Sequence, residues 1–157
     1  MLRTMSEPDL GILLALAYQE FVRELHVDLA EHGYDDLGRS DGYVFRALDA
    51  EPLTTSALAE RLAISKQGAG QLVDDMTRRG YLTGHPDPSD RRARLLELTP
   101  RGRQALMAAR DFHRRYEQRL ARRYGRQRVD GMRAMLTGMA PTYGHGALDP
   151  RVRAMDV

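Results

Sequence analysis

The feature that most constrains this fold is a pair of short amphipathic segments, near the middle of the chain, separated by a tight turn. Thr54 or Thr55 offers a hydroxyl N-cap for a helix that ends near Leu62. Ser65 caps the following helix, which ends at Gly80. The apolar residues of this second helix fall on one side of it, namely Ala69, Leu72, Val73 and Met76. Two helices joined by so short a turn predict a helix-turn-helix.

A β-hairpin and a long helix are expected next. Residues 81–83 and 95–98 have extended character, and residues 85–90 between them are rich in turn formers. Thr99 and Pro100 supply an N-cap followed by proline at the first helical position, which starts an arginine-rich helix over residues 101–124. The sequence therefore predicts a hairpin with a protruding tip, followed by a long helix.

Apolar residues at helical spacing flank this central region on both sides. They recur over residues 8–32, where Gly33 supplies the stop, and again over residues 41–48 and 128–140. The first apolar stripe is too long for a short domain to cover, so we expect a second copy of the chain to bury part of it; an ordinary core helix is the alternative. Residues 141–157 offer little to pack and are expected to form a loose tail.

Composition narrows the class of protein. The 157 residues suit one domain, with ordinary globular contents of hydrophobic (42%) and charged (29%) residues. The lack of cysteine excludes disulfides, thiolate metal sites and cysteine-based redox sensing, and suits a reducing cytoplasm. The longest apolar run, residues 10–17, is too short to span a bilayer, and Glu7 and Asp9 beside it argue against a secretory signal. We therefore expect a cytoplasmic protein with no membrane contact.

The sequence has no motif for catalysis or metal binding. It contains no nucleophile elbow, no phosphate-cradling glycine loop and no His-Glu zinc motif. Asp28 and His32 have helical i, i+4 spacing, but two ligands do not make a metal site, so we interpret them as a helix-surface pair. We expect no enzyme, no catalytic residue, no metal and no cofactor.

Charge is distributed unevenly along the chain. Residues 1–54 carry a net charge of −7 and residues 55–157 carry +9, and only one of the 24 basic residues, Lys66, is a lysine. This asymmetry indicates a polyanionic partner, with a solvated basic face as the alternative.

The polar side of the second helix is the expected partner-binding surface. Its amino-terminal end offers free backbone N–H groups and the positive end of the helix dipole, which favour phosphate. Glutamine side chains can hydrogen-bond adenine bidentately in the major groove. The residues expected to contact DNA from this helix are Ser65, Lys66, Gln67, Gln71 and Arg78.

Two further features belong to this surface. Gly68 and Gly70 each cost about 1 kcal/mol in a helix relative to alanine, and either a close backbone approach to DNA or packing inside the domain would account for them. The hairpin tip carries Asp90, Arg91 and Arg92, whose guanidinium groups suit a narrow A·T minor groove. We expect Asp90 to pair with Arg92 and orient it for insertion; a plain surface ion pair is the alternative.

These motifs together resemble those of MarR-type regulators. Residues 58–67, continued by residues 72–74 and 79–82, are similar to the winged helix-turn-helix of that family. Residues 87–102 are similar to its wing and to the start of its next helix, with Asp90 and Arg92 at the positions of the paired wing Asp and Arg. Gly68 and Gly70 depart from the family's pattern.

The resemblance implies a mainly α fold with a small β-hairpin wing, in which a winged helix-turn-helix domain joins a helical dimerisation region formed by the N- and C-terminal helices. Residues 1–157 would form a single MarR-like domain, with dimerisation helices at 8–37 and 101–140, a DNA-binding lobe at 41–99 and a tail at 141–157. A homodimer is implied, each protomer offering a recognition helix to the major groove and a wing to the minor groove.

The resemblance also implies a small-molecule effector. Members of the family bind a small aromatic or phenolic anion between the dimer helices and the DNA-binding lobe. The candidate ligand-binding residues on the expected helices are Tyr18, His26, Tyr43, Arg46, His113 and Tyr116, each with plain packing as its alternative. Arg46 is the preferred partner for a ligand carboxylate because it lies in the otherwise acidic amino-terminal part.

We therefore predict a sequence-specific, DNA-binding transcriptional regulator. It is expected to be a repressor that binds a pseudo-palindromic, double-stranded DNA operator as a homodimer and responds to a small effector. The alternative is a winged-helix protein–protein interaction module without sequence-specific DNA binding, whose basic half meets an acidic partner.

Overall fold

The structure is a computed structural model that describes residues 8–90, 93–139, 142–143 and 147–148. Its helices are α1 (Leu10–Glu31), α2 (Asp41–Ala50), α3 (Thr55–Leu62), α4 (Lys66–Arg78), α5 (Pro100–Tyr124) and α6 (Arg126–Met139). Its strands are β1 (Leu53–Thr54), β2 (Leu82–Pro86), β3 (Arg94–Leu98), β4 (Thr142–Tyr143) and β5 (Ala147–Leu148). The expected fold class, mainly α with a small β-hairpin wing, is confirmed.

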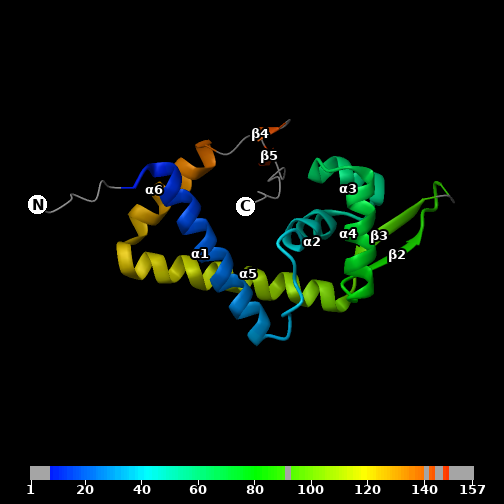
Figure 1. The fold of residues 1–157 in the computed structure, drawn as a ribbon, viewed down its shortest axis with the longest axis horizontal. Coiled ribbons are helices and arrows are strands. Elements are labelled where there is room, and N and C mark those ends of the chain that lie inside the picture. Colours follow the sequence, from blue (N-terminus) through cyan, green and yellow to red (C-terminus); the bar gives the residue numbers. More distant parts are fainter. Residues whose placement is uncertain (1–7, 91–92, 140–141, 144–146, 149–157) are drawn as a thin grey trace, which may run out of the picture.

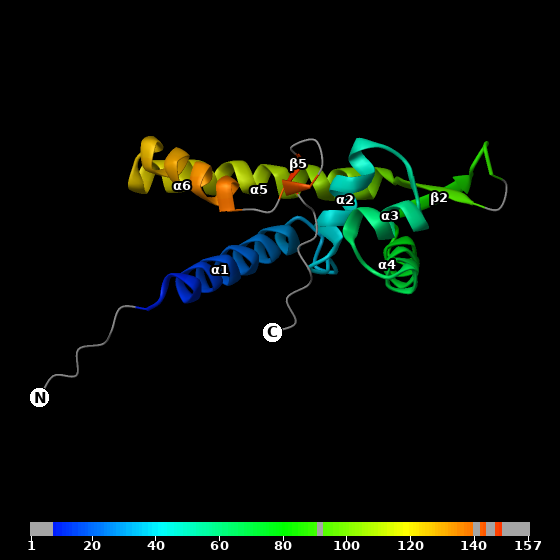
Figure 2. The same cartoon turned by 90° about the horizontal axis from the view of Figure 1, so that it is seen from above.

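The elements divide into two regions joined by the long helix α5. Helices α1 and α6 lie at one end, and α2, α3 and α4 gather with the sheet at the other (Figure 1). Helix α5 packs against α1 and α6 in the first region and against α2 in the second. Turned by 90°, the molecule shows the β2–β3 hairpin extending away from the helices at the end opposite α6 (Figure 2). This hairpin is therefore free to act as a wing.

The sheet has three antiparallel strands in the order β1-β3-β2. Leu82 pairs with Leu98 across β2 and β3, and Leu53 pairs with Leu96 across β1 and β3. Strand β1 escaped the sequence analysis because two residues are too few to show a period-2 pattern.

Helix starts and stops follow the capping residues that the sequence offers. Thr54, rather than Thr55, caps α3, since its side chain accepts a hydrogen bond from the Ala57 amide at 3.2 Å. Ser65 accepts from the Gly68 amide and Thr99 from the Gly102 amide, both at 3.0 Å. The positive φ of Gly80, 79°, is the left-handed conformation expected after a helix end.

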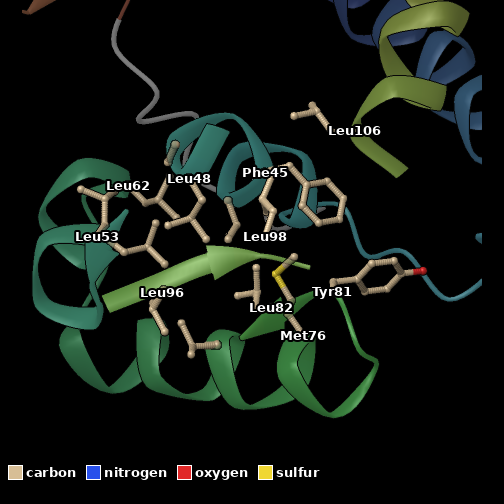
Figure 3. Close-up of a cluster of buried hydrophobic side chains, with 14 of the residues drawn as sticks. Phe45, Leu48, Leu53, Leu62, Met76, Tyr81, Leu82, Leu96, Leu98 and Leu106 are labelled. Atoms are coloured by element: carbon tan, nitrogen blue, oxygen red, sulfur yellow. The ribbon is translucent and has the colours of Figure 1, made fainter. Parts of the chain in front are cut away.

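A single hydrophobic cluster holds the second region together. Its buried side chains come from α2, α3, α4, the sheet and the start of α5 (Figure 3). They include Phe45, Leu48, Leu58, Leu62, Met76, Tyr81, Leu82, Leu96, Leu98 and Leu106. Because the two helices of the helix-turn-helix bury their apolar sides in this cluster, their polar sides must face outward.

The first region leaves much apolar surface uncovered in the single chain. On α1 the exposed apolar side chains include Leu10, Ile12, Leu13, Leu16 and Val27, and on α6 they include Met132, Met135, Leu136 and Met139. Leu10 and Leu13 belong to the first apolar stripe, for which we expect a second copy of the chain as the cover.

Several remaining expectations concern the surface and the tail. Asp28 and His32 do form a helix-surface pair, with 3.6 Å between His32 Nδ1 and Asp28 Oδ2. Within the described part of the chain, no cluster of three potential metal ligands occurs and no helix is long and apolar enough to cross a membrane. Of the expected tail, β4 and β5 form a short antiparallel pair, and its looseness stays a prediction.

Candidate nucleic-acid interface

Helix α4 presents a continuous polar surface to solvent. Ala69, Val73 and Met76 are buried, which fixes the rotation of the helix about its axis. The residues on the opposite side are exposed, namely Ser65, Lys66, Gln67, Gln71, Asp74 and Arg78. Gln67 and Gln71 are exposed, as predicted, and their contact with DNA stays a prediction.

The amino-terminal end of α4 is suited to an anion. Ser65 uses its hydroxyl oxygen to accept from Gly68, and its own O–H remains able to donate. The first amides of a helix lack intrahelical acceptors, so those of Lys66 and Gln67 can meet a phosphate oxygen. The Lys66 ammonium adds a positive charge at the same end.

The carboxyl-terminal end of α4 carries an arginine held by its own helix. Arg78 Nη1 donates to Asp75 Oδ1 at 3.0 Å, with 72% of the arginine side chain exposed. An exposed ion pair of this kind contributes at most about 1 kcal/mol, so Arg78 can exchange Asp75 for a phosphate at little cost.

The wing is ordered by hydrogen bonds close to its tip. Asp87 Oδ1 accepts from the Ser89 amide at 2.8 Å and from the Ser89 hydroxyl at 2.7 Å, and the Ala93 amide donates to the Asp90 carbonyl at 2.9 Å. Asp90 is exposed, whereas Arg91 and Arg92 lie outside the described residues. The proposed pairing of Asp90 with Arg92 therefore stays a prediction.

A hydrogen bond that joins the two strands of the wing was not predicted from the sequence. Arg94, on β3, donates from Nη2 to the carbonyl of Gly84 on β2. A Cβ on Gly84 would lie 3.1 Å from Arg94 Nε, so glycine leaves room for this side chain across the hairpin. The glycine within an extended segment was the only signal in the sequence.

The inner side of α4 is fixed by a second arginine that the sequence analysis did not select. Arg79 donates to Asp41 Oδ2 at 2.8 Å, to Asp75 Oδ2 at 2.8 Å and to the Asp36 carbonyl at 2.7 Å. Burial lowers the pKa of Arg79, but the hydrogen bonds and charges of Asp41 and Asp75 outweigh burial and leave that pKa raised. This arginine ties the end of α4 to the segment between α1 and α2.

The same segment is attached to the start of α5. The Tyr81 hydroxyl donates to Asp36, and Arg101 Nη2 donates to the Tyr81 oxygen at 3.1 Å. Burial and the hydrogen bond to Asp36 raise the pKa of Tyr81 to about 12, against the opposing effect of Arg101. The phenol therefore stays neutral and keeps its O–H as a donor at physiological pH.

The residues predicted to bind an effector gather where α1, α2 and α5 meet. Arg46 Nη2 lies 3.3 Å from His113 Nε2, and the Phe21 ring packs on His113 and Tyr116 with centroids 5.1 and 4.9 Å apart. Burial and the Arg46 charge lower the pKa of His113, so its neutral ring nitrogen can accept from Arg46.

The other candidate effector residues are tyrosines and a histidine. Burial and the nearby Tyr18 phenol raise the pKa of Tyr43 to about 12. His26 is half-buried on α1. The other five candidates lie in pairs or clusters that combine a cation, phenols and aromatic faces.

Comparison with known proteins agrees with this architecture. Residues 35–93 match the sequence model of the MarR family. The chain is similar to the transcriptional repressor CouR bound to a 23-mer DNA duplex, with 28% identity, a TM-score of 0.70, and coverage of 88% of this chain and 99% of that one. A comparison with curated proteins finds no significant match.

More distant structures share the fold. FabT of Streptococcus pneumoniae in complex with DNA is 20% identical, with a TM-score of 0.69 over 82% of this chain and 90% of that one. The S. aureus MepR–DNA complex is 21% identical, with a TM-score of 0.67 over 85% of this chain and 97% of that one.

Proposed function

The chain is a MarR-family winged-helix transcriptional regulator, and from this premise we propose that it binds a double-stranded DNA operator sequence-specifically as a homodimer. The observation that carries the proposal is the outward polar side of α4, which lies next to a wing that projects from the same lobe. The DNA held by CouR, FabT and MepR supports the same class of partner. Because such an operator is part of the cell's DNA, the proposal includes a cytoplasmic location.

Helix α4 enters the major groove in this proposal. Gln67 and Gln71 are one helical turn apart and exposed, so they can meet base edges on the same side of the helix. Ser65, Lys66 and Arg78 contact phosphates at the two ends of the helix and set its register. The wing carries Arg91 and Arg92 to the flanking minor groove, with Asp90 orienting Arg92.

A symmetric dimer sets the form of the operator. The exposed apolar side chains of α1 and α6 give a second copy a surface to bury. Two recognition helices related by a two-fold axis require a pseudo-palindromic site with half-site centres about 34 to 36 Å apart. A dimer that covers such a site excludes other proteins from it, so we assign a repressor role.

An aromatic or phenolic anion is the proposed effector. Arg46 offers a cation for its carboxylate, and Tyr18, Tyr43, His113 and Tyr116 offer aromatic faces and polar edges near it. His26, on α1, is the sixth candidate. Replacing Arg46 with methionine should abolish the effect of such an acid on DNA binding while leaving binding without the acid unchanged.

Selection of bound fragments from random DNA tests the proposed function. The wild-type protein should enrich a two-fold symmetric sequence, and log K for that sequence should fall linearly with log salt concentration, by about 0.9 per phosphate neutralised. A flat salt response, or no enrichment of any sequence, would favour a protein-binding module instead.

Single variants then test the two contact surfaces. Gln71→Ala should relax the preference at one base pair, worth about 1–3 kcal/mol, whereas Arg92→Ala should weaken binding with a modest loss of preference. Gln118→Ala, which removes an exposed glutamine from α5, is the matched control and should bind as the wild type does. If Gln71→Ala kept both affinity and preference, α4 would not be the reading helix.

A further inference from the structure

Among the residues that the structure describes, no contact requires position 70 to be a glycine. A Cβ built on Gly70 would meet no atom within 4 Å, so packing inside the domain does not require a bare backbone there. Its φ also lies outside the positive region that favours glycine. Glycine is nevertheless the poorest helix former after proline, and Gly70 lies in the interior of α4.

Gly68 differs from Gly70 in this respect. A Cβ on Gly68 would lie 3.1 Å from the Ser65 hydroxyl oxygen, which is the atom that caps the helix by accepting from the Gly68 amide. The N-cap therefore accounts for one of the two glycines and leaves the other without an internal cause.

The neighbours of Gly70 show which side of α4 it occupies. Lys66 and Gln67 precede it by one turn and Asp74 follows it by one turn, and these three side chains are exposed, whereas Val73, also one turn on, is buried. Gly70, itself half-buried, thus lies at the edge of the polar side of α4, next to residues proposed to face DNA. Without a Cβ, the helix backbone can come closer to whatever covers this side.

We propose that Gly70 is a specificity-determining residue, at which the bare backbone of α4 lies against the wall of the DNA major groove. This close approach seats the helix deeply enough for Gln67 and Gln71 to reach base edges. The inference rests on the proposed DNA-binding function. It deepens that function, because the depth to which α4 enters the major groove would depend on the absence of a methyl group at position 70.

The test is Gly70→Ala, measured by DNA affinity and thermal stability together. The probe is a fragment that the wild-type protein selects from random DNA, compared with an unselected fragment of the same length. Alanine should raise Tm by about 2 to 4 °C, because it improves the helix. The same variant should bind the selected fragment about tenfold or more weakly, because the added methyl group overpacks the interface.

Two further variants isolate the steric cause. Gly42→Ala adds the same methyl group to α2, where a Cβ also meets nothing within 4 Å, and should keep the wild-type affinity. Gly70→Ser should lose as much affinity as Gly70→Ala, since its side chain is at least as large.

The outcomes separate this inference from the function on which it rests. If the wild type enriches a sequence and Gly70→Ala binds it equally well or more tightly, the inference is wrong and the proposed function stands. Equal weakening on the selected and unselected fragments, or recovery of affinity in Gly70→Ser, would also overturn it. If the wild type enriches no sequence, the proposed function fails and the inference fails with it.

Discussion

At the scale of single residues, the charge of Asp41 stands out because only 2% of its surface is exposed. A carboxylate so deeply buried is stable only if its oxygens are hydrogen-bonded or paired. Asp41 Oδ2 accepts from the Gly38 amide and from Arg79, both at 2.8 Å. The pair joins residues 38 positions apart, so it fixes α4 against α2 and the segment before it.

We expect Asp41→Ala to lower the free energy of unfolding by about 2–3 kcal/mol. The substitution leaves Arg79 buried beside an empty site, although Asp75 still pairs with it and limits the loss. Urea unfolding followed by circular dichroism measures the change. Glu20→Ala removes an exposed ion pair to Arg23 and should leave the midpoint unchanged, so equal shifts in the two variants would contradict the structural role of Asp41.

His113 makes stability depend on pH. Burial and the charge of Arg46 lower its pKa from 6.5 in the folded state, so the unfolded chain binds more protons between the two values. The free energy of unfolding should therefore decrease as pH falls through about 6.5 toward the lower, folded pKa.

The measurement is Tm at a series of pH values from about 7.5 to 5.5. His113→Gln should show a smaller decrease in Tm over this range than the wild type. His85 is exposed on β2, so His85→Gln should keep the wild-type slope. A wild-type slope in His113→Gln would mean that other groups control the pH dependence.

At the scale of elements, the junction between the sheet and α5 is closely packed. Gly102 lies in the first turn of α5, and a Cβ there would overlap the carbonyl oxygen of Tyr81. That oxygen already accepts from the Thr99 amide at 3.0 Å. The backbone of α5 can therefore approach the base of the wing only because residue 102 is a glycine.

Gly102→Ala should destabilise the protein by about 1–3 kcal/mol, because two backbone segments must separate to admit the methyl group. The change is measured by chemical unfolding. Gly42→Ala is the control, since a methyl group there meets no atom, and should leave stability unchanged or slightly higher. Wild-type stability in Gly102→Ala would show that the junction is looser than described.

At the scale of the whole molecule, some arginines of the basic half form ion pairs with acidic residues of the acidic half of the same chain. Arg115 pairs with Asp28 at 2.6 Å and Arg119 pairs with Glu24, which joins α5 to α1. Arg110 pairs with Asp49 at 2.7 Å, which joins α5 to α2. The basic half thus meets the acidic half along α5, and the cations proposed to contact phosphate are those of α4 and the wing.

The exposed apolar surface of α1 and α6 leads to a prediction about assembly. Leu16 and Met135 expose 54% and 65% of their surfaces, and a glutamate at either position would bury a charge in the proposed dimer interface. Leu16→Glu and Met135→Glu should convert a dimer into a monomer and weaken operator binding by about 100-fold or more, since one half-site then binds alone.

Light scattering coupled to size-exclusion chromatography measures the assembly. Gln104→Glu adds the same charge to the exposed surface of α5 and should remain dimeric. If both interface variants stayed dimeric, the second copy would have to bind elsewhere on the molecule.

The local sequence was sufficient to place most helices and the wing. Ser65, Thr99 and Gly80 act within a few residues of their own positions, so their effect on helix ends can be derived without the rest of the chain. The apolar stripe of α4 likewise fixes which side faces outward, because helical periodicity is a local property. That is why the outward glutamines could be predicted.

Only the tertiary structure decided which distant residues meet. Strand β1 exists because β3 lies beside it, and the pairing of Arg79 with Asp41 depends on a segment 38 residues earlier. Arg46 contacts His113, which is 67 positions later in the chain. Neither residue spacing nor composition predicts that these two side chains lie close together. Such contacts depend on how whole helices pack against one another. The packing is stabilised by buried side chains from many parts of the chain, so no short stretch of sequence determines it.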